Sequence, residues 1–303
     1  MDAPDPVAIL SALGWQAEGP ITPVAGGWDN HLWRFVTADG RRHALRVYRA
    51  YEGRDPAAAA HTAANEAAAM NAARAAGLPA PAVEALSDYN GAPCFILEWM
   101  PGVPMLDALG SRPWRLERLG REFGRLQARL HRADPAGLRE LRAEDLRGII
   151  PDEDLNQRVI RELSGRTFCH LDYHPINVLV DKGKLSAILD FTPAAVTDLR
   201  LDLAMTKAAL LVAPLPPSPL NPLLQVVRRL LARAWERGYR LEAGAFPLTP
   251  LFEAAAISRF VVETRRAVDE GRGWATAKDV AAMERAYERA LAAAGRLRTT
   301  PEA

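Results

Sequence analysis

Hydrophobic and polar positions along the first hundred residues alternate in short runs that are typical of β-strands. The clearest runs are residues 32–37, 43–48 and 93–99. Asp39-Gly40 separates the first two runs and predicts a hairpin between them. After the second run, Asp55-Pro56 opens an alanine-rich stretch that Gly77 ends, a composition that predicts a long helix. The pattern breaks at residues 100–102, where we expect a boundary between one lobe at residues 1–99 and a second at residues 100–303.

Beyond this break the spacing of hydrophobic residues becomes mainly helical. The stretches that predict helices are residues 113–132, 199–212, 221–238, 250–270 and 276–295. Between them, residues 168–191 predict a set of short strands, with 178–180 and 185–189 joined by a turn. The chain is therefore expected to be an α+β protein, with a small strand-rich lobe that carries one long helix and a larger, mainly helical lobe.

Composition and charge narrow the class of protein. Of 303 residues, 49% are hydrophobic and 25% are charged, values that exclude wholesale disorder. The 38 Lys and Arg residues balance 37 Asp and Glu residues, so no overall field attracts nucleic acid or an acidic membrane. Cys94 and Cys169 are too few for a disulfide framework. With no signal peptide and no unbroken hydrophobic span, we expect a cytoplasmic protein that binds neither nucleic acid nor membrane.

The chemically informative segment runs from His170 to Asn177 and continues at Asp190-Phe191. Its spacing, H-x-D-x-x-x-x-N followed thirteen residues later by D-F, is the arrangement of a kinase catalytic loop and metal loop. A carboxylate at Asp172 is suited to orient an acceptor hydroxyl and take its proton. The side-chain oxygens of Asn177 and Asp190 are ligands that Mg²⁺ prefers, and the predicted strand hairpin between them would bring the two residues together.

Each residue of this segment also has an ordinary structural interpretation. Asp172 and Asp190, taken singly, are equally common as turn or cap residues. His170 is best interpreted as a core histidine that holds the loop through the backbone, and His131 is expected to be structural as well. The Asp-Phe pair at the right distance from the loop favours the catalytic interpretation of the whole segment.

On these residues the chain resembles the aminoglycoside phosphotransferase and choline kinase-like family of small-molecule kinases. The resemblance is most specific over residues 170–204, where Asp202 matches an aspartate that is largely structural in the family. It implies a two-lobed protein-kinase-like fold with a small antiparallel sheet in the first lobe. It also implies transfer of the γ-phosphoryl group of ATP, or of GTP, to a hydroxyl of a small molecule, with Mg²⁺ as cofactor. The chain would act as a monomer or a homodimer.

The resemblance also assigns a nucleotide site to the first lobe. Gly26, Gly27 and Asn30 match the family's glycine loop over the phosphates, although a Gly-Gly pair is also a common turn. Glu98 and Met100 match the hinge whose backbone would bind adenine, with a register open by one residue.

Two further residues match the family's phosphate clamp. Arg46 corresponds to the cation that pairs with the α- and β-phosphates, where protein kinases have lysine, and no lysine precedes residue 182 in this chain. The alternative is a strand residue that faces solvent. Glu66 corresponds to the helix glutamate that orients this cation; otherwise it is an ordinary exposed helix residue.

Two departures from related patterns bear on function. The small-molecule kinases usually have glycine where Leu171 stands, and protein kinases have arginine there. The short stretch from Asp190 to Asp198 leaves little room for an activation loop. Both features argue against a protein Ser/Thr kinase, and the intact Asp172 and Asn177 argue against a pseudokinase that binds nucleotide without turnover. Both alternatives stay open at this point.

The substrate region is expected in the helices after Asp202. Residues 203–303 contain 15 Lys and Arg against 10 Asp and Glu. A site for a polycationic aminoglycoside would concentrate carboxylates, so this excess favours a neutral, zwitterionic or anionic alcohol, unless the charges simply lie on solvated helix faces. The candidates for an amine contact are Glu263, Asp269 and Glu270. The aromatic residues of the region, expected in the core rather than around a ligand, are Trp235, Phe260 and Trp274.

Overall fold

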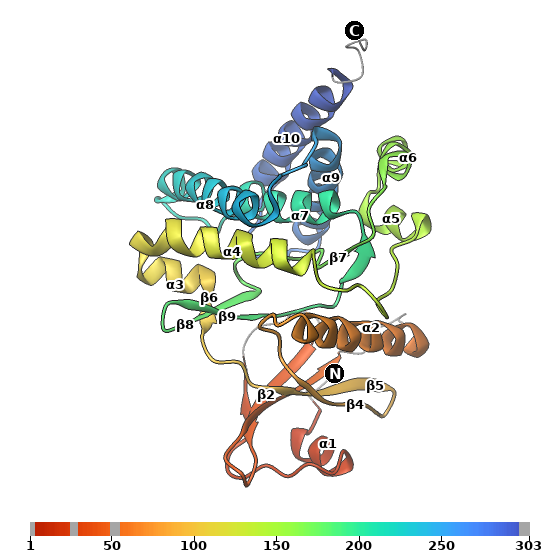
Figure 1. Cartoon of the computed structure of the whole chain (residues 1–303), viewed down its shortest axis with the longest axis vertical. Helices are drawn as coiled ribbons and strands as arrows, with labels where there is room; N and C mark the ends of the chain where they lie inside the picture. Colours follow the sequence, from red (N-terminus) through yellow and green to blue (C-terminus); the bar gives the residue numbers. More distant parts are fainter. Residues whose placement is uncertain (1–3, 25–29, 49–54, 297–303) are drawn as a thin grey trace.

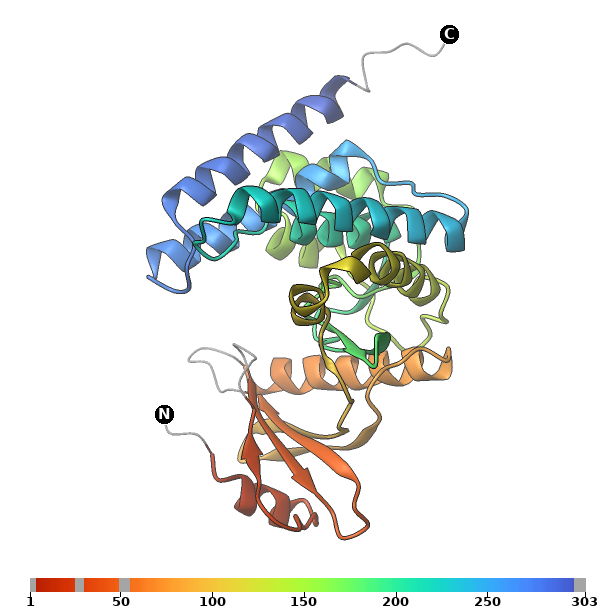
Figure 2. The same ribbon diagram turned by 90° about the vertical axis from the view of Figure 1, so that its left-hand side faces the viewer.

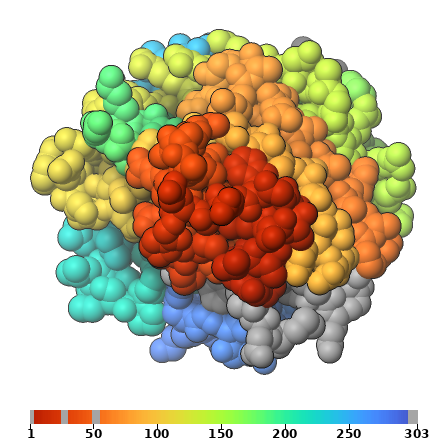
Figure 3. Space-filling view, turned by 90° about the horizontal axis from the view of Figure 1, so that it is seen from below, coloured from red at the N-terminus to blue at the C-terminus, as the bar shows by residue number. Residues whose placement is uncertain are grey.

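The computed structural model describes residues 4–24, 30–48 and 55–296, and it shows an N-terminal sheet with a long helix next to a larger, mainly helical part (Figure 1). A view turned by 90° keeps this arrangement, with α2 lying between the sheet and the helices (Figure 2). Seen from below, the N-terminal residues occupy the middle of the face and later elements project beyond them (Figure 3). The α+β, two-lobed architecture expected from the sequence is confirmed.

The N-terminal sheet is antiparallel, with its strands in the order β1-β2-β3-β5-β4. The strands are β1 (Thr22–Pro23), β2 (Asn30–Val36), β3 (Arg42–Tyr48), β4 (Val83–Tyr89) and β5 (Ala92–Glu98). The hairpin between β2 and β3 turns at Gly40, whose φ of 76° suits glycine. Helix α2 (Pro56–Ala75) begins after Asp55, whose carboxylate accepts the N–H of Ala57, and it ends just before Gly77, as expected.

Strand β3 is buried because both faces of the sheet are covered. Leu45 packs with Ile9 of α1 (Pro6–Ala12) on one face, whereas Ala44 belongs to the core on the α2 side. Side chains alternate along a strand, so Arg46 lies on the same face as Ala44, towards α2. Arg46 is only 9% exposed. The interpretation of Arg46 as a solvent-facing strand residue is therefore wrong.

The rest of the chain is dominated by helices. These are α3 (Met105–Ser111), the 3₁₀ turn η1 (Pro113–Arg115), α4 (Leu116–Leu130), α5 (Ala143–Ile149), α6 (Glu153–Glu162), α7 (Leu199–Leu211), α8 (Asn221–Ala243), α9 (Pro250–Asp269) and α10 (Ala277–Arg296). Two small sheets accompany them: β6 (Val103–Pro104) with β8 (Val178–Asp181) and β9 (Lys184–Ile188), and β7 (Thr167–Cys169) with β10 (Ala195–Thr197). No helix in the described part of the chain is long and apolar enough to cross a membrane.

Helices α4 and α8 lie against each other, and glycines permit their close approach. A Cβ atom on Gly124 would lie 2.0 Å from the carbonyl oxygen of Trp235, and one on Gly238 would lie 2.0 Å from that of Arg121. No larger residue fits at either position without moving the partner helix.

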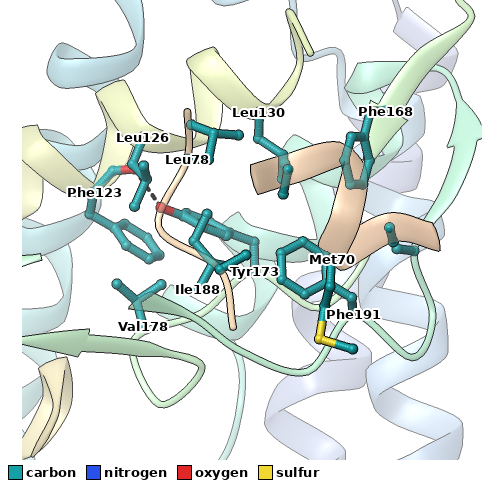
Figure 4. Packing of buried hydrophobic residues seen from close by; sticks show 14 of the residues in the cluster. Met70, Leu78, Phe123, Leu126, Leu130, Phe168, Tyr173, Val178, Ile188 and Phe191 are labelled. Atoms are coloured by element: carbon teal, nitrogen blue, oxygen red, sulfur yellow. Dashed lines mark hydrogen bonds between the residues drawn. The ribbon is translucent and has the colours of Figure 1, made fainter. Parts of the chain in front are cut away.

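One hydrophobic core joins α2 to the segment that carries the kinase-like motif. Figure 4 labels its central side chains: Met70, Leu78, Phe123, Leu126, Leu130, Phe168, Tyr173, Val178, Ile188 and Phe191. The Tyr173 hydroxyl donates to the carbonyl oxygen of Phe123 at 2.9 Å, so the one polar group of Tyr173 inside this core is satisfied. The core therefore anchors the motif between α2 on one side and α4 on the other.

Candidate active site

The loop between β7 and β8 is held by buried groups on both sides. His170 is fully buried, and its Nε2 donates to the carbonyl oxygen of Leu189 at 3.0 Å, as expected of a structural histidine. The N–H of Leu171 donates to the buried carboxylate of Asp202 on α7. Leu171 has a φ of 63°, a left-handed conformation that costs a leucine energy. The hydrogen bond from Leu171 to Asp202 therefore fixes an unusual backbone turn directly before Asp172.

Asp202 is the centre of a buried polar network. It accepts from Nε2 of Gln127 at 2.7 Å, and the same carboxylate oxygen lies 2.8 Å from Nε2 of His131. The other ring nitrogen of His131 lies 2.8 Å from the Tyr239 hydroxyl. Burial raises the pKa of Asp202, but the hydrogen bond and charge of His131 lower it more, so its pKa lies below the usual range. These contacts make His131 part of the scaffold and keep Asp202 ionised.

Asp172 lies at the edge of this buried region, with a third of its side chain exposed. Its Oδ2 accepts from the Asn177 side-chain amide at 3.0 Å and lies 3.4 Å from Nε2 of His174. Burial raises the pKa of Asp172, but the hydrogen bond and charge of His174 outweigh it, with smaller contributions from His170 and Arg259, so its pKa is lowered. Asp172 is thus a carboxylate at neutral pH that can accept a hydrogen bond from an acceptor hydroxyl.

Asn177 uses its donor towards Asp172 and leaves its amide oxygen for other partners. The side-chain NH₂ group donates to both the backbone oxygen and Oδ2 of Asp172, each at 3.0 Å. The β8–β9 hairpin pairs Val178 with Ile188, and the N–H of Leu189 donates to the Asn177 carbonyl oxygen at 2.8 Å. The hairpin therefore returns the chain to Asn177 just before Asp190, as the sequence indicated.

Asp190 follows the hairpin in a left-handed conformation, with a φ of 60°. Its Oδ1 accepts from the Thr192 hydroxyl at 2.8 Å, and the same hydroxyl lies 3.1 Å from Oε2 of Glu66. Burial and the nearby Glu66 carboxylate raise the pKa of Asp190 above its usual range. A cation beside Asp190 would offset both effects, because it favours the ionised carboxylate.

The Arg46 guanidinium forms a buried ion pair with Glu66 of α2. The same carboxylate accepts from the Tyr48 hydroxyl, and the guanidinium carbon lies 4.8 Å from the centre of the Phe95 ring. Burial alone would lower the pKa of Arg46, but the negative charge of Glu66, with smaller contributions from its other neighbours, outweighs burial. The pKa of Arg46 is therefore raised, and the guanidinium stays charged. Within the described part of the chain, Nε of Arg46 and Oε1 of Glu66 are buried without a hydrogen-bond partner. The pair therefore has one donor, Nε of Arg46, and one acceptor, Oε1 of Glu66, that could still form hydrogen bonds with a ligand or water.

The resemblance assigns Gly26, Gly27, Asn30, Glu98 and Met100 to a nucleotide site as well. Gly26 and Gly27 fall outside the described residues. Asn30 opens β2 opposite Tyr48, and its side-chain oxygen is buried without a partner among the described residues. The N–H of Glu98 donates to the carbonyl oxygen of Ala82, so only the carbonyl of Glu98 could meet an adenine. The Glu98 side chain faces away, towards Arg74 at 3.0 Å.

Met100 follows β5 in the connection to β6, where it is half-buried. No hydrogen bond of the described residues links Met100 to Asp172, Asn177 or Asp190. Thr192 links Glu66, and through it Arg46, to Asp190.

Two residues of the site could not be singled out from the sequence. Thr192 follows Asp190 by two positions, and a lone threonine carries no signal of its own. Arg259 lies on α9, and its Nη1 donates to the carbonyl oxygen of Leu171 at 3.5 Å. Arg259 and Leu171 are 88 residues apart in the sequence, and nothing in the local pattern of α9 indicates which element its arginines contact. The sequence alone therefore does not reveal this contact.

The donor set suits a hard divalent cation. The amide oxygen of Asn177, directly before β8, and the second oxygen of Asp190, shortly after β9, could both serve as ligands. Within the described residues, no group of three or more His, Cys, Asp or Glu side chains could enclose a metal ion. Two protein ligands are what Mg²⁺ commonly uses when phosphate oxygens and water complete its shell. These residues therefore fit Mg²⁺ held together with a nucleotide, and they do not fit a stand-alone metal site.

Comparison with solved structures identifies similar folds. An apo thermostable mutant of the aminoglycoside phosphotransferase APH(4)-Ia is 17% identical, with a TM-score of 0.63 over 96% of this chain and 99% of that one. The amicoumacin kinase hAmiN, solved with AMP-PNP, Ca²⁺ and Ami, is 13% identical, with a TM-score of 0.64 over 94% and 93%. The macrolide 2'-phosphotransferase MphH from Brachybacterium faecium is 18% identical, with a TM-score of 0.56 over 98% of both chains. At these identities the likeness shows a shared fold.

Comparison with curated protein sequences gives no match. A family model does match, over residues 20–162 and 138–241, which together hold the N-terminal sheet, the Arg46–Glu66 pair, the catalytic loop and Asp190. Most of the chain is thus covered. The chain belongs to the phosphotransferase enzyme family.

Proposed function

We propose that this phosphotransferase moves the γ-phosphoryl group of ATP to a hydroxyl group of a small molecule. The observation that carries the proposal is the arrangement of Asp172, Asn177 and Asp190 at one site, linked through Thr192 to the buried Arg46–Glu66 pair. Three solved relatives in fold support the choice of reaction, since their names describe phosphotransferases or kinases and one was solved with AMP-PNP. The substrate stays unassigned by these comparisons.

Each residue receives a role from its own geometry. Asp172, ionised and partly exposed, would accept a hydrogen bond from the acceptor hydroxyl and take its proton as the new bond to phosphorus forms. Asn177 and Asp190 would hold Mg²⁺, which when bound neutralises charge on the phosphates. Arg46, oriented by Glu66, would contact phosphate oxygens, and Asn30 with Gly26 and Gly27 would complete the cover over them.

The lobes would divide this work. Residues 1–99 would bind the nucleotide, with the backbone of Glu98 at adenine beside that of Met100, the first residue of the second lobe. Residues 100–303 would supply the catalytic loop and the acceptor site. ATP is the proposed donor, with GTP as the alternative. Transfer would be direct and in line, and catalysis would come mainly from positioning and from neutralising charge.

Two other functions are less well supported. A pseudokinase would lack the base or a metal ligand, whereas Asp172, Asn177 and Asp190 are all present; Asn177 donates to Asp172, and Thr192 donates to Asp190. A protein Ser/Thr kinase would need room for an activation segment. Here β10 (Ala195–Thr197) begins within five residues of Asp190 and pairs at once with β7.

The experiment that tests the proposal is ADP release from Mg·ATP in the presence of a panel of small alcohols. The panel should contain aminoglycosides, macrolides, choline, homoserine and sugars. Turnover with one of them should fall by a factor of about a thousand or more in Asp172→Asn, while Mg·ATP still binds. Chelation of Mg²⁺ and the variant Asp190→Ala should each abolish Mg²⁺-dependent nucleotide binding. Unchanged turnover in Asp172→Asn would exclude Asp172 as the base.

A further inference from the structure

A hollow of about 280 Å³ lies along α9. Its lining from α9 consists of Phe260, Glu263, Thr264 and Ala267, which share one helix face because they are three, four and seven positions apart. The remaining walls come from the α9–α10 connection with Trp274 and from the segment after α7 with Pro214. Figure 2 shows the α9–α10 connection on the side of the helical part that is nearer to the N-terminal sheet.

Arg259 connects this hollow to the proposed base. Its guanidinium donates to the carbonyl oxygen of Leu171, the residue before Asp172, and through Nε it donates to Oε1 of Glu263 at 2.6 Å. One arginine side chain therefore spans from the catalytic loop to the first polar residue of the hollow. The residue before Asp172 and the carboxylate of the hollow are therefore joined by this one side chain.

The walls of the hollow are mainly apolar. Trp274, expected in the core from the sequence, has 48% of its surface exposed, which corrects that expectation. Trp235, by contrast, is buried as expected, and Phe260 is half-buried against the neighbouring helices. The Trp274 ring is fixed at its polar end, where Nε1 lies 3.5 Å from the Pro214 carbonyl oxygen. An exposed, oriented indole beside alanine and proline offers a flat apolar surface to a ligand.

The charges around the hollow compensate one another. Glu263 is the single carboxylate among the described lining residues, and it is paired with Arg259. Arg272, the cation of the lining, is paired with Glu270. Of the three candidates for binding an amine, Glu263 and Glu270 pair with arginines, and Asp269 is exposed and does not line the hollow. A polycation would find no free carboxylate here, whereas an uncharged molecule would disturb neither pair.

From these contacts we infer that the hollow along α9 is the acceptor subsite and that it takes an uncharged alcohol with an apolar body. This inference rests on the proposed function and adds the substrate class. The apolar body lies against Trp274 and Phe260, and the hydroxyl extends past Arg259 to Asp172. A volume near 280 Å³ suits part of a drug-sized molecule, so the hydroxyl-bearing end would extend beyond the hollow.

The test measures binding without nucleotide, using calorimetry on the full chain with alkyl β-glucosides of increasing chain length. Affinity should rise about threefold to fourfold for each methylene that enters the hollow. Trp274→Ala should weaken binding of the octyl compound about tenfold. The matched control is Trp114→Ala, which removes a tryptophan that is 75% exposed and lies outside the hollow, and it should leave the affinity unchanged. Thermal unfolding checks that both variants stay folded.

Affinity that does not rise with chain length, or an equal loss in Trp114→Ala and Trp274→Ala, would overturn the inference. So would an aminoglycoside that binds more tightly than the octyl glucoside and is unaffected by Trp274→Ala. The companion assay, ADP release with the same alcohols, separates the two proposals. If binding depends on chain length but no bound alcohol causes ADP release, the hollow is a binding site for such molecules and phosphoryl transfer to them is rejected. ADP release that depends on Asp172 but not on Trp274 would do the reverse.

Discussion

The carboxylate of Asp202 accepts the backbone N–H of Leu171, the residue immediately before the proposed base. Leu171 has a left-handed backbone conformation that glycine would adopt without cost. Its side chain is nevertheless only 2% exposed, and it packs in the hydrophobic cluster that α7 and α9 form with Leu201 and Phe252. Burial of the leucine side chain and the hydrogen bond to Asp202 therefore act together to hold a turn that the backbone alone disfavours.

Leu171→Ala should be less stable than Leu171→Gly. Both variants lose the buried side chain, at about 2–5 kcal/mol. Only glycine also relieves the left-handed conformation, worth about 1–2 kcal/mol, so the glycine variant should unfold at the higher urea concentration. The same pair of substitutions at Leu201, buried in α7 within the same core, should show the opposite order, with alanine the more stable. If Leu171→Ala is more stable than Leu171→Gly, the backbone at position 171 is not strained.

Asp202→Asn should destabilise the fold by about 1–3 kcal/mol at pH 7, because the amide places a donor against the donors of Gln127 and His131. The folded-state pKa of Asp202 is lowered, so its stabilisation is complete above the unfolded value near 3.8 and is lost as the pH falls through the folded value. The difference in unfolding free energy between wild type and variant should shrink as the pH is lowered from about 5 to below about 4. Urea titrations across this range, with exposed Asp269→Asn as control, measure it. A difference that grows in acid would contradict the assignment.

Thr192→Val should weaken Mg·ATP binding about fivefold, since valine keeps the shape but removes the hydroxyl that fixes Asp190 beside Glu66. Thr192→Ser keeps the hydroxyl and should bind nearly as wild type. Calorimetric titration with nucleotide at several Mg²⁺ concentrations makes the comparison. If valine and serine variants bind equally well, the bridge does not position the metal ligand.

The Arg46–Glu66 pair allows stability and nucleotide binding to be separated. Arg46→Met should leave the fully buried Glu66 unpaired and cost about 3–5 kcal/mol of stability, and it should weaken ATP binding at least tenfold. Adding Glu66→Gln removes the unpaired charge, so the double variant should recover stability without recovering affinity. Urea unfolding and nucleotide titration on the four proteins of this cycle test both statements. Recovery of affinity in the double variant would mean that Arg46 does not contact the nucleotide.

Gly124→Ala should be among the most damaging single-methyl additions in the chain, at about 3 kcal/mol or more. The new Cβ would lie 2.0 Å from the Trp235 carbonyl oxygen, which belongs to helix backbone and cannot turn aside. Gly110→Ala is the control, because nothing lies within 4 Å of its Cβ position on α3. That variant should be neutral or stabilised by up to about 1 kcal/mol, and thermal unfolding should show the contrast.

What the sequence could predict depended on whether the signal was local. Helix α2 was predicted almost to the residue because Asp55, Pro56 and Gly77 mark its ends. Strand β4 was missed, since Val83–Tyr89 is half-exposed and its regularity is interrupted by a register shift near Ala85. The short helices α1, α3, α5 and α6 were missed for a similar reason, because each is too short to show a clear period.

The candidate site shows the same limit. The spacing of Asp172, Asn177 and Asp190 was visible because one loop and one hairpin hold all three. The facing of Arg46 was ambiguous because both sides of β3 are buried, which removes the alternation that would have settled it. Arg259 was out of reach because its contact with Leu171 depends on how α9 packs.

The hydrophobic core in Figure 4 has a consequence for how the chain unfolds. Met70 and Leu78 from the α2 region share one cluster with Phe191, next to the proposed metal ligand, and with Phe123 of α4. A cut after residue 99 would expose this cluster on both fragments, so neither half is expected to be independently stable. The N-terminal sheet and the helical part should instead lose structure in one cooperative transition, and a ligand that binds either part should raise the melting temperature of both.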